Sequence, residues 1–260
     1  MSALSVEHLG VKYSGRPVLR DVSFSLAPGE VVAYLGANGS GKTTTVRVLT
    51  GLLTPGNGRV LVDGRAIEDD LVGYRRRLGY VPETADVYPF LSGREYLQLV
   101  GRLRALRDEV LDERVDELLE TLGLGEHRYQ ALSSYSKGMR QKVLLCAALL
   151  HDPEILILDE PLAGLDVTAV MVTKALLREL AARGRTILYS THLLEVAETL
   201  CRRVLILHDG RIVADDSVEN LRRLSQQPSL EAVFSARVLD ESPDEIARRV
   251  IEIVSSPVGG

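Results

Sequence analysis

The sequence has few cysteines and few histidines. The 260 residues include only two cysteines, Cys146 and Cys201, and five histidines. Two cysteines without a pattern exclude a disulfide framework and are typical of a protein of the reducing cytosol. The histidines show none of the spacings that metal ligands have. The composition, 45% hydrophobic and 26% charged, is that of an ordinary soluble globular protein.

Long hydrophobic runs are also missing. The longest apolar run covers 143–150, whereas a membrane-spanning helix needs roughly twenty such residues. The first residues, MSALSVEHLG, lack the charged start and apolar stretch of a signal peptide. We therefore expect a cytoplasmic protein that needs a partner for any work at a membrane.

Neither sign of charge dominates the sequence. Lysine and arginine number 31 and aspartate and glutamate 36, which gives a formal net charge of −5. This balance argues against nucleic acid as the main partner.

Strand patterns open the chain and return in its second half. Alternating apolar and polar residues predict strands within 1–35, and 58–67 is typical of a hairpin with Asp63 and Gly64 at its turn. Later strands, separated by helical stretches, are predicted at 155–158, 186–189 and 204–207. Strands that alternate with helices predict an α/β fold with a mainly parallel sheet, preceded here by an N-terminal antiparallel β subdomain.

A helical pattern occupies about 92–150. Leu99, Leu103 and Leu106 are expected to share an apolar helix face, with charged residues on the opposite side. We interpret this segment as a helical lobe inserted into the α/β core. The predicted parts are a domain of residues 1–220, the helical subdomain of about 84–150 within it, and a tail of uncertain structure at 221–260.

A glycine-rich segment, GANGSGKT, begins at residue 36 and fits the phosphate-binding pattern G-x-x-x-x-G-K-[ST] between a predicted strand and a predicted helix. Glycines let backbone N–H groups turn toward phosphate oxygens, Lys42 reaches the β- and γ-phosphates, and Thr43 can bind Mg²⁺. We predict a nucleotide site made by the residues Gly36, Asn38, Gly39, Ser40, Gly41, Lys42, Thr43 and Thr44.

Acidic residues and a histidine follow two of the later strands. Asp159 and Glu160 come directly after the apolar run 155–158, and His192 comes shortly after 186–189. The carboxyl ends of parallel strands meet at the sheet edge where the phosphate loop begins. Asp159 is therefore predicted to hold Mg²⁺ through a water molecule, Glu160 to polarise an attacking water, and His192 to contact the γ-phosphate.

In their order along the chain, these motifs resemble those of the ATP-binding subunits of ABC transporters. The resemblance spans about residues 2–220. It includes LAGLD at 162–166, which looks like the D-loop of the family, and Tyr13, which matches the aromatic residue that stacks on adenine. The resemblance implies a P-loop NTPase core, ATP and Mg²⁺ as cofactors, and ATP hydrolysis in which Lys42, Glu160 and His192 are catalytic.

The segment YSKGM at 135–139 occupies the place of the family signature, LSGGQ. Ser136 and Gly138 match the signature, whereas Lys137 departs from it. In this family two subunits pack head to tail, and each signature closes over the γ-phosphate that the other holds. The resemblance therefore implies that Ser136, Lys137 and Gly138 bind ATP on a second copy of this chain or on a related ATP-binding subunit.

Glu83 stands where the family usually has a glutamine that contacts Mg²⁺ and the attacking water. A glutamate can still ligate Mg²⁺, but it adds a negative charge beside the γ-phosphate and lacks the amide donor. This glutamate, together with LEAVF at 230–234, is similar to the branch of the family that exports drugs, lipids, polysaccharides or ions.

The resemblance implies a motor subunit that drives a separate integral membrane permease and sits, through it, on the inner face of the cell membrane. Two alternatives stay open. One is a nucleotide-gated regulatory subunit with little turnover, which Glu83 and the altered signature allow. The other is a soluble ABC-type ATPase without a permease, although the sequence shows neither the long coiled-coil insertion nor the second cassette of such proteins.

Overall fold

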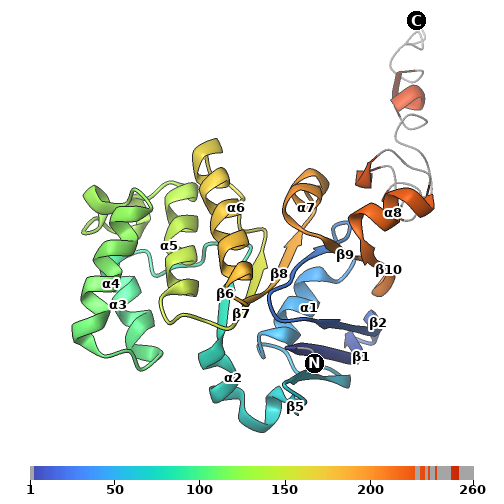
Figure 1. The fold of residues 1–260 in the computed structure, drawn as a ribbon, viewed down its shortest axis with the longest axis horizontal. Coiled ribbons are helices and arrows are strands. Elements are labelled where there is room, and N and C mark those ends of the chain that lie inside the picture. Colours follow the sequence, from blue (N-terminus) through green and yellow to red (C-terminus); the bar gives the residue numbers. More distant parts are fainter. Residues whose placement is uncertain (1–2, 226–228, 232–233, 235–237, 239–246, 252–260) are drawn as a thin grey trace, which may run out of the picture.

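The structure, a computed structural model, describes residues 3–225, 229–231, 234, 238 and 247–251. Two β-sheets and the helices around them make up the described chain (Figure 1). No helix in this described part is both long and apolar enough to cross a membrane.

The larger sheet has six strands in the order β10-β9-β3-β8-β7-β6. The strands from β9 to β6 are parallel to one another, and β10 joins the edge antiparallel to β9. All residues of β3, β7 and β8 are buried, as expected for strands that are covered on both faces. The predicted α/β fold with a mainly parallel sheet is confirmed. Its strands are β3 (Val31–Leu35), β6 (Leu78–Val81), β7 (Ile155–Asp159), β8 (Thr186–Thr191), β9 (Arg203–His208) and β10 (Arg211–Ser217).

The second sheet is antiparallel, with four strands in the order β2-β1-β4-β5. Asp63 and Gly64 connect β4 to β5 with φ angles of 50° and 80°. Two positive φ angles in succession are what a tight hairpin turn requires, and Asp-Gly adopts them readily. The predicted antiparallel subdomain and its hairpin are confirmed. Its strands are β1 (Leu4–Tyr13), β2 (Arg16–Leu26), β4 (Asn57–Val62) and β5 (Arg65–Ala66).

Helices cover both faces of the larger sheet (Figure 1). Apolar side chains of α1 (Lys42–Leu49) share one buried cluster with strands of both sheets, so α1 lies between the sheets. On the opposite face, α6 (Val167–Ala182) and α7 (Leu194–Leu200) pack in a separate cluster. The short helix α2 (Leu71–Arg77) leads into β6. This layering leaves the carboxyl ends of β3, β7 and β8 at one edge of the sheet, where the functional loops begin.

The helical lobe, at the left of Figure 1, consists of α3 (Gly93–Leu103), α4 (Asp108–Thr121) and α5 (Lys137–Leu149). Helix α5 belongs to the lobe and to the core at once. Val143 packs within the lobe, whereas the next residue, Leu144, packs against the larger sheet. One rigid helix therefore links the two parts.

The predicted apolar face of the first lobe helix is wrong. Leu106 lies beyond the end of α3, and Leu99 and Leu103 are 36% and 77% exposed. The buried side of α3 carries Gly101, where a Cβ would lie within 2.2 Å of Leu111 on α4. The helices approach closely at this glycine, which a count of leucines does not reveal.

The predicted boundary between domain and tail falls within helix α8 (Val218–Ser225). Beyond it, Leu230 and Val238 are buried in the same cluster as α6 and α7. Two residues of the exporter-like segment at 230–234, Ala232 and Val233, lie outside the described residues.

Candidate functional site

The phosphate loop connects the end of β3 to the start of α1, and glycine is required at two of its positions. A Cβ on Gly36 would lie 2.4 Å from the Ser40 Oγ and 2.6 Å from the Leu207 carbonyl oxygen, and Gly41 has a φ angle of 111°. Side chains rarely tolerate either condition. No side chain caps α1, so its first N–H groups stay available to an anion.

Lys42, the first residue of α1, is buried inside this loop. Its Nζ donates hydrogen bonds to the carbonyl oxygens of Gly36, at 2.7 Å, and Ala37, at 3.2 Å. Burial lowers the pKa of Lys42, and the charges of Glu160, Asp159 and Glu83 oppose that effect. The ammonium group therefore sits where it can exchange two loop carbonyls for phosphate oxygens.

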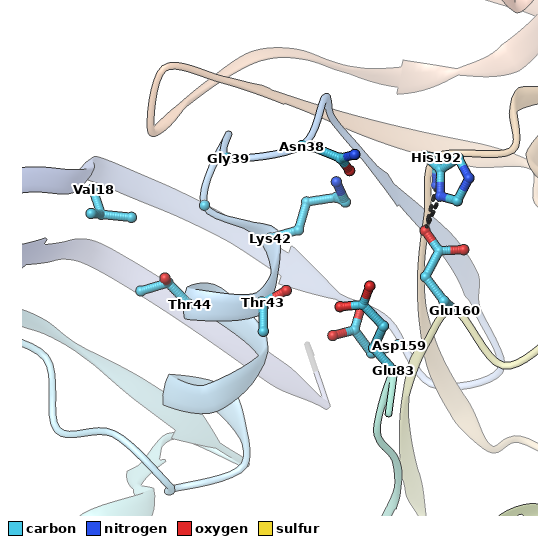
Figure 2. A pocket seen from close by; sticks show the side chains of 11 residues that line it. Val18, Asn38, Gly39, Lys42, Thr43, Thr44, Glu83, Asp159, Glu160 and His192 are labelled. Carbon is cyan, nitrogen blue, oxygen red and sulfur yellow. Dashed lines mark hydrogen bonds and ion pairs between the residues drawn. The ribbon is translucent and has the colours of Figure 1, made fainter. Parts of the chain in front are cut away.

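Two carboxylates face the hydroxyl of Thr43 across the pocket, those of Glu83 and Asp159 (Figure 2). Asp159 ends β7 and is 2% exposed, and its Oδ2 atom has no hydrogen-bond partner. Burial raises the pKa of Asp159, and the charges of Glu83 and Glu160 raise it further. A cation at this position would relieve both the burial of the charge and the repulsion between the carboxylates.

The described residues include no group of three or more histidine, cysteine, aspartate or glutamate side chains that could hold a metal by itself. Mg²⁺ commonly binds through one or two carboxylates together with substrate phosphates, so Asp159 and Glu83 are the residues here that could contribute to such a site.

Glu160 follows β7 with a φ angle of 48°, which is uncommon for a residue other than glycine. Its carboxylate accepts hydrogen bonds from the Thr191 Oγ1, at 2.9 Å, and the His192 backbone N–H, at 2.8 Å, and it pairs with the His192 Nδ1 at 2.5 Å (Figure 2). The ends of two neighbouring strands thus hold the carboxylate in one orientation. The sequence interpretation missed Thr191, although a hydroxyl directly before the histidine was visible.

A pocket of about 400 Å³ joins these groups and contains most of the predicted site. Gly36, Ser40 and Tyr13 are not among its lining residues, and Ser40 is buried within the loop. The pocket is lined by Val18, Asn38, Gly39, Gly41, Lys42, Thr43, Thr44, Glu83, Asp159, Glu160 and His192.

The hairpin of β1 and β2 borders this pocket. Tyr13 ends β1, pairs with Arg16 and is 42% exposed. Val18, two residues beyond Arg16 on β2, lines the pocket directly. The sequence interpretation missed Val18, whose only signal is its nearness to Tyr13 across the hairpin.

The signature turn lies outside the pocket. Ser136 caps α5 by accepting a hydrogen bond from the Met139 backbone N–H at 3.2 Å, and Lys137 is exposed. Gly138 packs against the D-loop of the same chain, where a Cβ on it would lie 2.5 Å from the Gly164 carbonyl oxygen. The structure therefore does not bring Ser136, Lys137 and Gly138 together with the phosphate loop of their own chain.

A protein-family model for ABC transporters matches residues 19–163. The chain belongs to the ABC transporter ATP-binding family. The match covers the phosphate loop, the signature turn and Glu160. ATP-binding domains of this family are ATPases, and the predicted catalytic residues Lys42, Glu160 and His192 line one pocket here.

Several curated proteins are similar to this ABC subunit over most of their length. The ABC-type transporter ATP-binding protein EcsA of Bacillus subtilis is 37% identical over 85% of this chain and 90% of its own. The ABC transporter ATP-binding protein NatA of the same organism is 34% identical over 85% of this chain and 90% of its own. The linearmycin resistance ATP-binding protein LnrL, also of B. subtilis, is 33% identical over 81% and 68%.

Solved ABC cassettes share the fold. An ATP-binding subunit of an ABC transporter superimposes with a TM-score of 0.85 at 35% identity, covering 90% of this chain and 99% of its own. A dimer of the cassette MJ0796, in a post-hydrolysis state bound to ADP and Pi, gives a TM-score of 0.76 at 25% identity and covers 82% and 98%. ABC cassettes therefore form dimers, and the MJ0796 cassette binds ADP and Pi.

Proposed function

We propose that this ABC subunit is an ATP-driven motor that pairs head to tail with a second copy of itself, or with a related subunit, and drives a separate membrane permease from the inner face of the membrane. One observation carries the proposal. The pocket holds the phosphate loop and the acidic residues, but the signature turn of the same chain lies outside it, against Gly164. A second molecule would complete the site.

In the proposed cycle, adenine packs on Tyr13 and Val18, and the phosphates lie along the loop from Gly36 to Thr44. Lys42 exchanges its bonds to the loop carbonyls for phosphate oxygens. The partner molecule adds the Ser136 hydroxyl and the N–H groups of its α5 start to the γ-phosphate.

Glu160 then orients the attacking water and accepts its proton as the water oxygen bonds to the γ-phosphorus, and the bond between that phosphorus and the β,γ-bridging oxygen breaks, which leaves ADP and inorganic phosphate. The His192 Nδ1 is engaged by Glu160, so we assign Nε2 to the γ-phosphate. Reopening of the dimer follows release of inorganic phosphate.

Thr43, Asp159 and Glu83 are the residues that would hold Mg²⁺. The unpartnered Oδ2 of buried Asp159 supports this assignment. When bound, Mg²⁺ neutralises charge on the phosphate oxygens. Glu83 adds a second carboxylate to this position, where the family usually has an amide.

A groove of about 320 Å³ between β6, α3 and α5 supports the assignment of a permease partner. Tyr80, Tyr96 and Leu103 line it, and Leu103 is 77% exposed. The groove begins close to Glu83, one residue beyond the lining residue Pro82, so a protein segment seated there would lie against the loop that enters the nucleotide pocket.

Outward transport is the direction that we propose. Glu83 supports it through its similarity to the exporter branch, and so does the similarity to a relative named for linearmycin resistance. Antibiotic resistance is a role that removal of a compound from the cell would serve.

Mixing two inactive variants of the full chain tests the proposal. Lys42→Ala disables the phosphate loop and Ser136→Ala the signature turn, and we expect each alone to lose on the order of 10²-fold in ATP turnover. A head-to-tail pair of the two variants contains one intact site, so an equal mixture should recover roughly a quarter of the wild-type sites. Ser133→Ala, at an exposed serine just before the turn, is the control and should leave turnover unchanged.

No recovery on mixing would show that the signature turn does not act on a second molecule. Full activity of Ser136→Ala alone would have the same meaning. Wild-type protein that binds ATP but turns it over only in negligible amounts, with and without membranes, would favour the regulatory subunit instead.

A further inference from the structure

The loop after Glu160 is held by the helix that presents the signature turn. Gln141 lies in α5 and is 1% exposed, and its Nε2 donates a hydrogen bond to the Pro161 carbonyl oxygen at 3.2 Å. A buried amide that makes a hydrogen bond to the backbone orders that backbone, because leaving the carbonyl unpaired would cost its desolvation. The peptide group that it holds directly follows Glu160.

A second contact joins the same two elements. Gly138 lies three residues before Gln141 and so shares its helix face. A Cβ on Gly138 would lie 2.5 Å from the Gly164 carbonyl oxygen, and one on Gly164 would lie 2.9 Å from the Cγ and Cδ of Lys137. The first residues of α5 therefore contact the segment 161–164 at two places, through a hydrogen bond to Pro161 and through close packing against Gly164.

The backbone on either side of Glu160 is ordered as well. The Glu160 N–H donates to the Ser190 carbonyl oxygen at 2.9 Å, and the Ala163 N–H donates to the Glu160 carbonyl oxygen at 3.1 Å. Glu160 itself keeps a left-handed φ angle of 48°, which persists only where the surroundings enforce it. Among these contacts to the segment around Glu160, the hydrogen bond from Gln141 is the one made by helix α5 of the helical lobe.

We propose that Gln141 is a positioning residue for hydrolysis, which fixes the Pro161 carbonyl and thereby the orientation of Glu160. This inference rests on the proposed function, in which Glu160 orients the attacking water. It makes the signature turn and Glu160 of one chain a single rigid unit, although they would serve two different nucleotides. When the signature turn binds the ATP held by the partner molecule, this contact would fix the orientation of the Glu160 carboxylate in the chain's own site.

Two variants of the full chain test this role. Gln141→Met keeps the shape and removes the donor, and Gln141→Glu replaces the donor by a second acceptor facing the carbonyl. A displacement of about 1 Å in a reacting group can cost on the order of 10²-fold. For Gln141→Met we expect a roughly tenfold lower kcat with an unchanged KM for ATP and unchanged ATP-dependent dimerisation, and for Gln141→Glu a larger loss.

The decisive measurement is the same substitution in a Glu160→Gln background. If Gln141 acts through Glu160, Gln141→Met should not lower the residual single-turnover rate of Glu160→Gln any further. Thr173→Val is the matched control, since Thr173 is also buried and donates to the Ala169 carbonyl oxygen at 2.8 Å, away from the site. It should change stability without changing kcat.

The inference is overturned if Gln141→Met hydrolyses ATP at the wild-type rate, or if it lowers the rate tenfold in the Glu160→Gln background as well. A wild-type rate in Glu160→Gln alone would overturn the proposed function instead, so the two failures are distinguishable. Thermal unfolding of each variant, measured alongside its ATPase assay, distinguishes a loss of folded protein from a loss of turnover by folded protein.

Discussion

Helices α1 and α5 both begin with a lysine that directly follows the N-cap residue. In α1 the N-cap is Gly41, no side chain caps the helix, and Lys42 is buried against the loop carbonyls. In α5 the N-cap is Ser136, its hydroxyl already caps the helix, and Lys137 is exposed. The first of these helix starts lines the pocket of about 400 Å³, and the second lies outside that pocket.

The difference shows what turns a helix N-terminus into a binding site. The start of α1 combines uncapped N–H groups, a buried cation and nearby carboxylates, the groups from which we propose that the phosphate and metal site is built. The start of α5 offers a hydroxyl and a cation at the surface, outside the pocket of its own chain. We propose that it is half of a site whose other half belongs to another molecule.

The largest effect on ATP turnover is expected at the α1 site, from removal of the Glu160 carboxylate that we propose orients the attacking water. Glu160→Gln keeps the shape of the side chain but cannot accept a proton, so ATP turnover should fall on the order of 10²–10⁴-fold while ATP binding persists. A steady-state ATPase assay with a nucleotide-binding measurement checks this. Glu126→Gln, at an exposed glutamate of the lobe, is the control, and equal turnover in the two variants would remove Glu160 from the mechanism.

Lys137 tests the surface side of the comparison. Its ammonium group is exposed, so its contact with the partner's ATP should be modest and sensitive to salt. We expect Lys137→Ala to raise the ATP concentration for half-maximal dimerisation roughly threefold, with the difference lost near 1 M salt. Analytical ultracentrifugation in the Glu160→Gln background measures it, with Lys142→Ala on the same helix as control. An equal midpoint for both variants would place Lys137 at the rim only.

A substitution of Asp159 tests whether burial of its charge destabilises the nucleotide-free protein, and its expected effect is the smallest of the three. Its pKa is raised by burial and by Glu83 and Glu160. Between the unfolded and the folded pKa the folded state binds more protons, so its stability falls as the pH rises through this range. Asp159→Asn carries no charge to bury and should raise the nucleotide-free Tm by roughly 2–4 °C near pH 7.

The gain from Asp159→Asn should disappear on acidification below about pH 4, where aspartate is protonated in both states. Thermal unfolding across this pH range measures it, with Asp69→Asn at an exposed position as control. A gain that grows on acidification would contradict the burial of a charge at Asp159.

Most of the pocket was predictable from local patterns, and the exceptions share a cause. The phosphate loop, Asp159 and Glu160 stand out because a short apolar strand ends directly before each of them. Val18 and Thr191 were missed because tertiary placement brings them to the site: Val18 lies at a register shift of the β1–β2 pair, between Pro17 and Leu19, and Thr191 donates a hydrogen bond to Glu160, which follows the neighbouring strand β7. The exposed face of α3 was mispredicted for the same reason, because close packing at Gly101 decides which side is buried.

The sequence by itself determined the α/β class, the order of the motifs and the chemistry of the phosphate loop, because glycine content and apolar periodicity act over a few residues. Only the tertiary structure decided that Glu83 stands beside Asp159 and that Glu160 pairs with His192, and it placed the signature turn outside the pocket of its own chain. Those placements follow from the strand order β3-β8-β7-β6, which brings distant segments to one sheet edge. Pairing between strands is a long-range property that no local pattern encodes.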